Sequence, residues 1–127
     1  MQIGEVADRT GLSLRTIRHY EEVGLVIPSA RTKGGFRLYT AADVDRLMVI
    51  RRMKPLDFSL EEMRDLLSVT DRLSADEPLE EAEHKRLRER LDTYRKVADA
   101  RCETLRAQLM AAEDFAATLR RRLGPQG

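Results

Sequence analysis

Cysteine, tryptophan and long apolar runs are what this sequence has least of. It contains one cysteine, no tryptophan and 5% aromatic residues in 127. A single cysteine excludes an intrachain disulfide and suits a reducing compartment, so we expect a cytoplasmic protein. No apolar run approaches the length of a membrane span, and no signal peptide precedes the first patterned segment, so we expect no membrane partner. With so few aromatics, the core must consist mainly of Leu, Val, Ile, Met and Ala.

The net charge is small, but it is unevenly distributed. The chain carries 23 Lys and Arg against 22 Asp and Glu, for a net charge of +1. Residues 1–58 hold 10 basic and 7 acidic residues (net +3), and residues 59–127 hold 13 basic and 15 acidic residues (net −2). An electrostatic footprint for nucleic acid therefore lies, if anywhere, in the first half of the chain.

The first patterned segment, residues 3–25, predicts two short helices joined by a tight turn. Apolar side chains at helical spacing mark the first helix, and Gly11 stands where a left-handed residue would end it. Ser13 is a good N-cap for the second helix, which carries Arg15 and Arg18. This layout is typical of a helix-turn-helix, whose second helix enters the major groove of DNA. An ordinary helical hairpin with surface arginines is the alternative.

Residues 26–39 break the helical period and predict a β-hairpin wing. Pro28 and Gly34-Gly35 punctuate the segment, and residues 36–39 alternate as a short strand does. We place the turn near Lys33-Gly34-Gly35. Arg31, Lys33 and Arg37 supply three cations and no acid, which suits phosphate contacts, and the Tyr39 hydroxyl could donate to a phosphate oxygen. The alternative is a solvated basic loop.

Two further helices are predicted from their caps. Thr40 and Asp43 form a possible capping box for a helix that Pro55 ends, and Ser59 with Glu62 forms a second box. This second helical pair should pack on the first, since one hairpin is too small to be stable alone. We therefore assign residues 1–69 to a DNA-binding domain and residues 70–78 to a linker.

Residues 79–123 contain no Gly or Pro and predict one helix of 45 residues. Such a helix is roughly 67 Å long and needs a partner to bury its apolar side. Residues 124–127 form a tail after it. Along the predicted helix itself, apolar residues recur in steps of 3 and 4, as in a coiled coil with one irregular step near Ala98. The alternative is a helix that folds back on its own domain, or an αα-hairpin. The predicted dimerisation seam is Leu87, Leu91, Tyr94, Ala98, Cys102, Leu105, Leu109, Ala112, Ala116, Leu119 and Leu123.

These segments, in this order, resemble the MerR family of bacterial transcription regulators. The most specific part is the run R-T-I-R-x-Y-E-x-x-G-L, followed by G-x-R-x-Y in the wing, and the likeness covers essentially the whole chain. The resemblance implies a mainly α fold: a winged helix-turn-helix domain, a helical extension and a long C-terminal helix forming an antiparallel coiled-coil homodimer. It also implies an inverted-repeat operator in promoter DNA, which the dimer bends and untwists so that RNA polymerase can use the promoter.

The resemblance also implies which residues contact DNA. Two positions depart from the family pattern: His19 stands where tyrosine is usual, and Asp57 stands where glycine is common before Phe58 and Ser59. The predicted DNA-binding residues are Ser13, Arg15, Thr16, Arg18, His19, Tyr20, Arg31, Lys33, Arg37 and Tyr39.

The sequence indicates no effector or cofactor. Metal-sensing relatives use several cysteines, whereas Cys102 is alone and His84 has no Cys or His near it in sequence, so we predict no metal site. Cys102 lies near the midpoint of the long helix and would meet its own copy in an antiparallel dimer, which makes an intersubunit thiol pair a hypothesis. We expect a short family member without an appended effector domain, and any small effector would bind near the coil.

Three functions remain open at this point. The first is a dimeric transcription regulator that remodels promoter DNA. The second is an architectural DNA-binding protein on the same scaffold with no effector, and the third is a coiled-coil adaptor with a vestigial helix-turn-helix. An enzyme is not expected, because no nucleophile and base pair, metal cluster or phosphate loop is visible.

Overall fold

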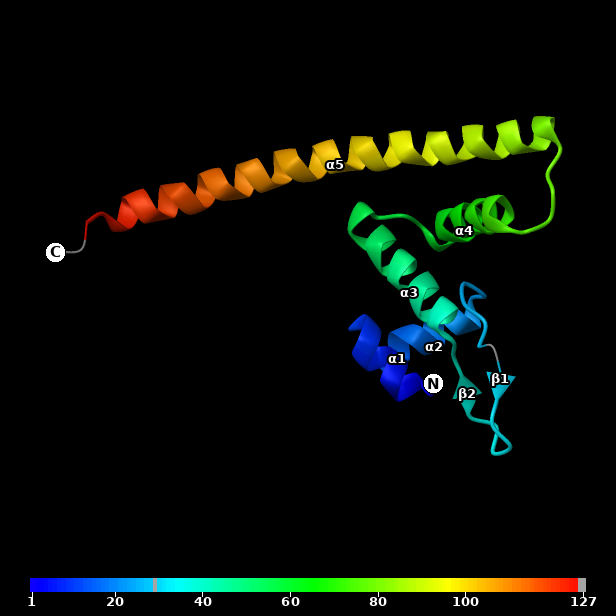
Figure 1. Ribbon diagram of the computed structural model, residues 1–127. Helices are drawn as coiled ribbons and strands as arrows, with labels where there is room; N and C mark the ends of the chain where they lie inside the picture. Colours follow the sequence, from blue (N-terminus) through cyan, green and yellow to red (C-terminus); the bar gives the residue numbers. More distant parts are fainter. Residues whose placement is uncertain (29, 126–127) are drawn as a thin grey trace. The chain divides into compact units, whose positions relative to one another are not determined.

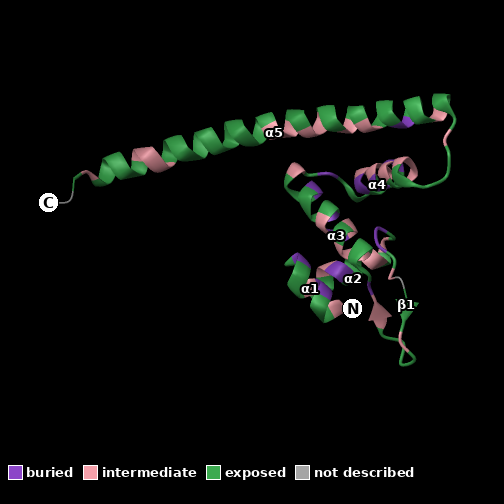
Figure 2. Ribbon diagram, viewed as in Figure 1, coloured by how far each residue is buried: buried purple, intermediate pink, exposed green. Residues whose placement is uncertain are grey.

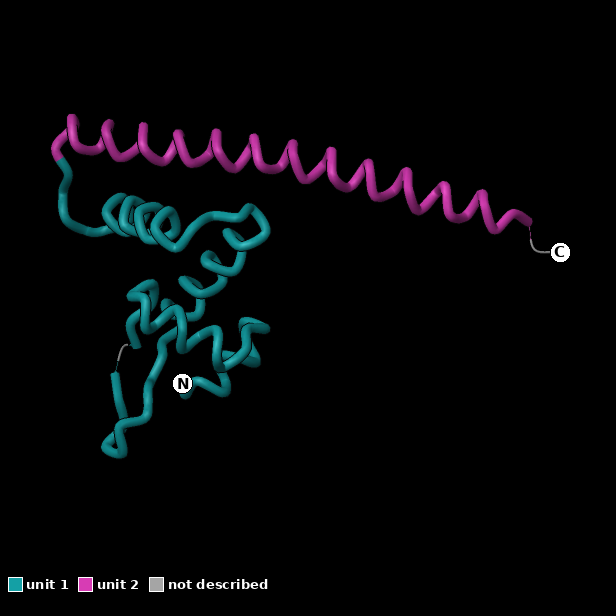
Figure 3. The backbone as a smooth tube through the Cα atoms, turned by 180° about the vertical axis from the view of Figure 1, so that it is seen from behind, with its two compact units in different colours: residues 1–79 teal, residues 80–127 magenta. Residues whose placement is uncertain are grey.

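The computed structural model describes residues 1–28 and 30–125, which divide into two compact units (Figure 3). Unit 1 covers Met1–Leu79 and unit 2 covers Glu80–Gly127. The mainly helical class predicted from the sequence is confirmed. The elements, labelled in Figure 1, are α1 (Ile3–Thr10), α2 (Leu14–Glu22), β1 (Ala30–Arg31), β2 (Arg37–Leu38), α3 (Ala41–Met53), the short 3-10 helix η1 (Lys54–Leu56), α4 (Leu60–Ser74) and α5 (Glu81–Leu123).

The helix-turn-helix forms as the sequence predicts. Gly11 ends α1 in the left-handed region at φ 71°, and its N–H donates to the Ala7 carbonyl. Two residues on, the Ser13 hydroxyl accepts from the backbone N–H of Thr16 and caps α2. Val6 and Ile17 are both fully buried where α1 packs on α2. The two short helices are therefore held by one turn and one shared core, and the outer side of α2 is left to solvent.

The wing is a two-stranded antiparallel hairpin. β1 pairs with β2 in a register that sets Arg31 opposite Arg37. The turn closes through the Gly35 N–H, which donates to the Thr32 carbonyl, and Gly35 has a positive φ of 82° that suits glycine. The turn lies where the sequence placed it, at Lys33-Gly34-Gly35.

Both predicted capping boxes are present, at Thr40 with Asp43 and at Ser59 with Glu62. Between them, Asp57 adopts the left-handed conformation at φ 57°, which explains how an aspartate occupies a turn position often held by glycine. One boundary differs from the prediction. The linker expected over 70–78 is helical as far as Ser74, because α4 contains no Gly or Pro to end it earlier.

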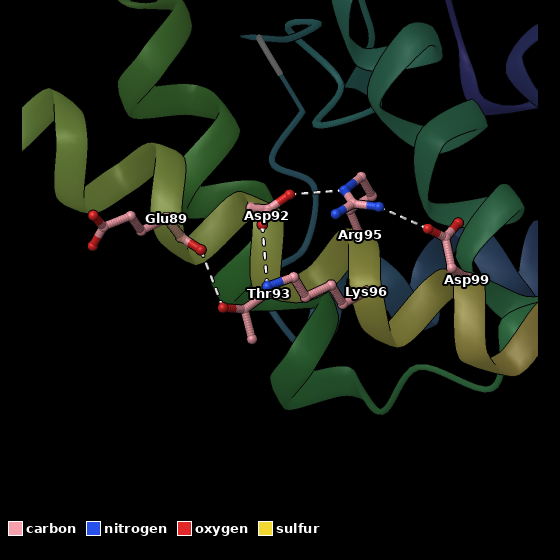
Figure 4. A network of polar contacts seen from close by, with 6 residues as sticks. All are labelled: Glu89, Asp92, Thr93, Arg95, Lys96 and Asp99. Atoms are coloured by element: carbon pink, nitrogen blue, oxygen red, sulfur yellow. Dashed lines mark hydrogen bonds and ion pairs between the residues drawn. The ribbon is translucent and has the colours of Figure 1, made fainter.

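Helix α5 is a single helix of 43 residues and exposes most of its length to solvent (Figure 2). Its surface carries local ion pairs: Arg95 reaches Asp92 at 2.7 Å and Asp99 at 2.8 Å, and Lys96 lies 3.6 Å from Asp92 (Figure 4). These pairs span three or four residues, so they support the helix without help from another element. Its large apolar side chains that are at least 41% exposed are Leu105, Leu109, Met110, Phe115, Leu119 and Leu123.

Candidate nucleic-acid interface

The outer side of α2 presents the first part of the candidate interface. Arg15, Arg18 and His19 are exposed, and the structure joins neither arginine to an acid within residues 1–28 and 30–125. Beside them, the Ser13 hydroxyl donates to the Thr16 hydroxyl at 2.8 Å. The two guanidinium groups on the outer side of α2 and the two hydroxyls at its N-terminal end are donors of the kind that bind phosphates and base edges.

Tyr20 has a different position from its neighbours on α2. Its residue surface is 1% exposed, and its hydroxyl has no hydrogen-bond partner among the described residues. The Lys54 ammonium lies 6.0 Å from the centre of the ring, within the range of a cation–π contact. The structure gives Tyr20 a core role that the sequence did not indicate, and its phosphate contact stays a prediction.

The wing is joined to α2 through one carboxylate, that of Glu21. Arg37 Nε lies 2.5 Å from Glu21 Oε2, and Arg31 Nη2 lies 3.6 Å from Glu21 Oε1. Tyr39 donates its hydroxyl to Glu21 Oε2 at 3.0 Å. The Glu21 side chain is only 14% exposed, so these contacts are partly shielded from water. We name Glu21, Arg31, Arg37 and Tyr39 the wing clamp.

The clamp perturbs the ionisation of two of its members. Burial, and then the hydrogen bond to Glu21, raise the pKa of Tyr39 to about 12. The hydrogen bond from Arg37 to the Glu21 carboxylate, with the Coulomb attraction between them, raises the pKa of Arg37. Tyr39 therefore stays protonated as a donor, and Arg37 stays charged, across the physiological range.

Glu21 is a functional candidate that the sequence did not reveal. It is 18 residues from Tyr39 along the chain, and no spacing rule connects a helix end with a strand. Two signals were available: Glu21 is the acid of the run R-T-I-R-x-Y-E-x-x-G-L, and it precedes a wing with three cations and no acid of its own. Lys33, at the wing tip, is exposed and makes no ion pair within the described part of the chain.

Two arginines fasten the C-terminal end of α2 to the second helical pair. Arg46 of α3 donates from Nε to the Leu25 carbonyl at 2.6 Å and from Nη1 to both carboxylate oxygens of Asp71 of α4. Arg64 of α4 donates to the Val23 carbonyl at 2.5 Å. Guanidinium groups at the carbonyl end of a helix also suit its dipole. These contacts fix the direction in which α2 presents its arginines.

Neither a metal centre nor a membrane span emerges from the described residues. No group of three or more His, Cys, Asp or Glu side chains in 1–28 and 30–125 is arranged to hold a metal ion. Within the same ranges, the helices are either too short or too polar to cross a bilayer.

Comparison with known proteins identifies relatives of both units. A family model described as MerR HTH family regulatory protein matches residues 1–69, and one described as MerR, DNA binding matches residues 44–122. The mercuric resistance operon regulatory protein of Bacillus cereus is 48% identical over 71 residues, which cover 56% of this chain and 54% of that protein. The chain thus spans about half the length of the curated relatives it matches.

Solved structures extend the likeness over most of the chain. The transcription regulator PbrR691 from Ralstonia metallidurans, in complex with lead(II), is 32% identical with a TM-score of 0.57, over 92% of this chain and 86% of that chain. HiNmlR, a MerR family regulator lacking the sensor domain and bound to promoter DNA, has a TM-score of 0.69 over 90% of this chain and 78% of that chain. At 22% identity, the second likeness concerns the fold alone.

Proposed function

The chain belongs to the MerR family of helix-turn-helix regulatory proteins, and on that premise we propose that it regulates transcription by binding a specific sequence in double-stranded promoter DNA. The observation that carries the proposal is the outer side of α2, where Arg15 and Arg18 are exposed and unpaired among the described residues. An α-helix with such donors fits the major groove, and arginine is the residue that most often reads guanine there.

The interface has a second part beside α2. Lys33 at the wing tip supplies another exposed cation, and Ser13, Thr16 and His19 supply polar groups on α2. In this arrangement, α2 reads base edges while the wing holds the phosphate backbone and fixes the register. The rest of the proposed interface consists of Arg31, Arg37, Tyr20 and Tyr39. Each of these residues either contacts the DNA or supports the residues that do.

We propose that the protein acts as a homodimer joined through α5. The exposed leucines Leu105, Leu109, Leu119 and Leu123 all lie on the seam that the repeat predicts, and together they form an apolar stripe. A dimer would carry two α2 helices to successive major grooves about 34 Å apart, on an inverted repeat. Following the family's mode of action, this dimer would bend and untwist the promoter so that RNA polymerase can use it. It would act in the cytoplasm.

The proposal is tested by selecting duplexes from a random DNA library with the whole protein. We expect enrichment of an inverted repeat that binds more tightly than a scrambled duplex of the same composition, in fluorescence anisotropy at a stated salt concentration. Arg15→Ala should weaken this binding by about 10- to 100-fold. Arg95→Ala, which removes the same charge from an exposed site on α5, is the matched control and should leave it unchanged.

Two results would contradict the proposal. One is the absence of any enriched repeat, and the other is equal binding by the Arg15→Ala variant and the natural chain. Selected DNA without any promoter response in a reporter strain would instead support an architectural role on the same scaffold.

A further inference from the structure

The wing clamp separates the cations of the candidate interface into two groups. Arg15, Arg18 and Lys33 make no ion pair with another described residue, whereas Arg31 and Arg37 both lie against Glu21. An unpaired surface cation is available to a phosphate at once. A guanidinium held by a carboxylate is already oriented, because the ion pair and its hydrogen bonds restrict its rotamers.

The clamp joins three elements at one point. Glu21 lies in the last turn of α2, Arg31 lies on β1, and Arg37 on β2 is its partner in the strand register. Each carboxylate oxygen therefore holds a different strand: Oε1 holds Arg31 and Oε2 holds Arg37. Arg31 also donates from Nη1 to the Gly35 carbonyl in the turn, so the same guanidinium extends the link to the wing tip.

Burial makes the clamp stronger than an exposed pair. The Glu21 side chain is 14% exposed and that of Arg37 is 34% exposed, and the Tyr39 hydroxyl shares Oε2 from a residue that is 2% exposed. An exposed ion pair contributes little to stability, but a shielded carboxylate that accepts the Tyr39 hydroxyl and lies against two guanidinium groups is costly to disturb. A hairpin with only two paired residues in each strand has little rigidity of its own, so its direction depends on such a link.

From this geometry we propose that Glu21 is a positioning residue for DNA recognition. It sets the angle between the wing and α2, and it orients Arg31 and Arg37 toward the phosphate backbone. The inference rests on the proposed DNA-binding function. It has an unusual consequence, since Glu21 is an acid that favours the binding of a polyanion.

The sign of one substitution tests the proposal. By charge alone, replacing an acid near DNA with a neutral residue strengthens binding, because repulsion from phosphates is removed. If Glu21 positions the wing, Glu21→Gln should instead weaken binding to the selected inverted repeat by roughly tenfold, the loss expected for one charge-assisted link. Glu22→Gln is the matched control, since Glu22 is adjacent and exposed and loses the same charge. It should bind the repeat as tightly as the natural chain, or more tightly.

The salt dependence of binding separates positioning from direct contact. Loss of a phosphate contact lowers the slope of log K against log salt by about 0.9, and this is expected for Lys33→Ala. Glu21→Gln should weaken the repeat complex far more than the complex with a scrambled duplex, so the specificity ratio should fall. The double variant Glu21→Gln with Arg37→Gln should lose less affinity than the sum of the two single losses, because the carboxylate acts in part through that guanidinium.

Clear outcomes overturn the proposal. Glu21→Gln binding the repeat as tightly as the natural chain, or more tightly, would reduce Glu21 to a surface acid. Fully additive losses in the double variant would show that Glu21 does not act through Arg37. A thermal melt of each variant shows whether it is still folded. The variant Tyr39→Phe removes one hydroxyl from the clamp and keeps the ring, so it should give a smaller loss of affinity for the repeat than Glu21→Gln. Failure of the natural chain to bind any selected repeat would instead refute the proposed function.

Discussion

Units 1 and 2 bury their apolar side chains to different extents. In unit 1, Val6, Ile17, Leu47 and Ile50 are completely buried, although the helices that carry them have only 8 to 13 residues. In unit 2, the large apolar side chains in the distal half of α5 remain exposed, with Leu109 at 59%. The short helices depend on tertiary packing, since helices of this length are marginal in water. The long helix has local ion pairs for support, and the apolar stripe that it exposes is the one that the proposed homodimer would bury.

The largest expected effect comes from placing a charge on the stripe. Leu109→Asp would put two carboxylates into the proposed dimer interface, one from each copy, and should weaken dimerisation by a thousandfold or more, on the order of 4 kcal/mol. Sedimentation equilibrium of the whole protein measures it. Met110→Asp is the matched control, because Met110 is 67% exposed but lies off the predicted seam. Equal effects of the two variants would break the seam assignment.

The core of unit 1 should respond to the loss of one apolar side chain. Ile17→Ala removes three carbons from a fully buried position between α1 and α2 and should lower the free energy of unfolding by about 2 to 5 kcal/mol. Urea unfolding followed by circular dichroism measures this loss. Arg9→Ala, at an exposed α1 site whose ion pair with Glu5 spans one helical turn, should change it by less than about 0.5 kcal/mol. A loss below 1 kcal/mol for Ile17→Ala would contradict a closed core.

The wing clamp predicts a loss of stability at alkaline pH. The pKa of Tyr39 is raised to about 12 in the folded chain, against about 10 when unfolded, so the folded state holds this proton more tightly. The associated stability is complete below pH 10 and is lost as the pH rises toward 12, by at most about 2 to 3 kcal/mol. The measurement is the difference in unfolding free energy between the natural chain and Tyr39→Phe, at pH 9 and at pH 11.5. A difference that does not shrink at the higher pH would contradict the shift.

The smallest expected effect concerns the turn between η1 and α4. Asp57 has a positive φ of 57°, which alanine adopts at a cost of about 1 kcal/mol. Asp57→Ala should therefore lower the free energy of unfolding by about that amount, and Asp57→Gly should leave it within about 0.5 kcal/mol. Thermal melts of the two variants decide the point, and identical melting temperatures would show that the conformation stores no strain.

Local features were predictable because they depend on residues close in sequence. Gly11, Ser13 and the two capping boxes each act within four residues, and all lie where the sequence placed them. Helix α5 followed from the absence of Gly and Pro, and its predicted start at Leu79 was two residues early. The predicted end of α4 was further from the observed end at Ser74, since nothing in residues 70–74 distinguishes a helix from a polar linker.

The sequence by itself therefore determined the helices, their caps, the wing turn and the apolar repeat of α5, because hydrogen bonds and side-chain periodicity act over a few residues. It also indicated which cations lie on or near α2. Only the tertiary structure decided that Tyr20 lies in the core and that Arg31, Arg37 and Tyr39 converge on Glu21. The physical reason is distance along the chain: the other members of the clamp are 10 to 18 residues from Glu21, and only a folded unit 1 brings their polar groups within 3.6 Å of its carboxylate and shields them from water.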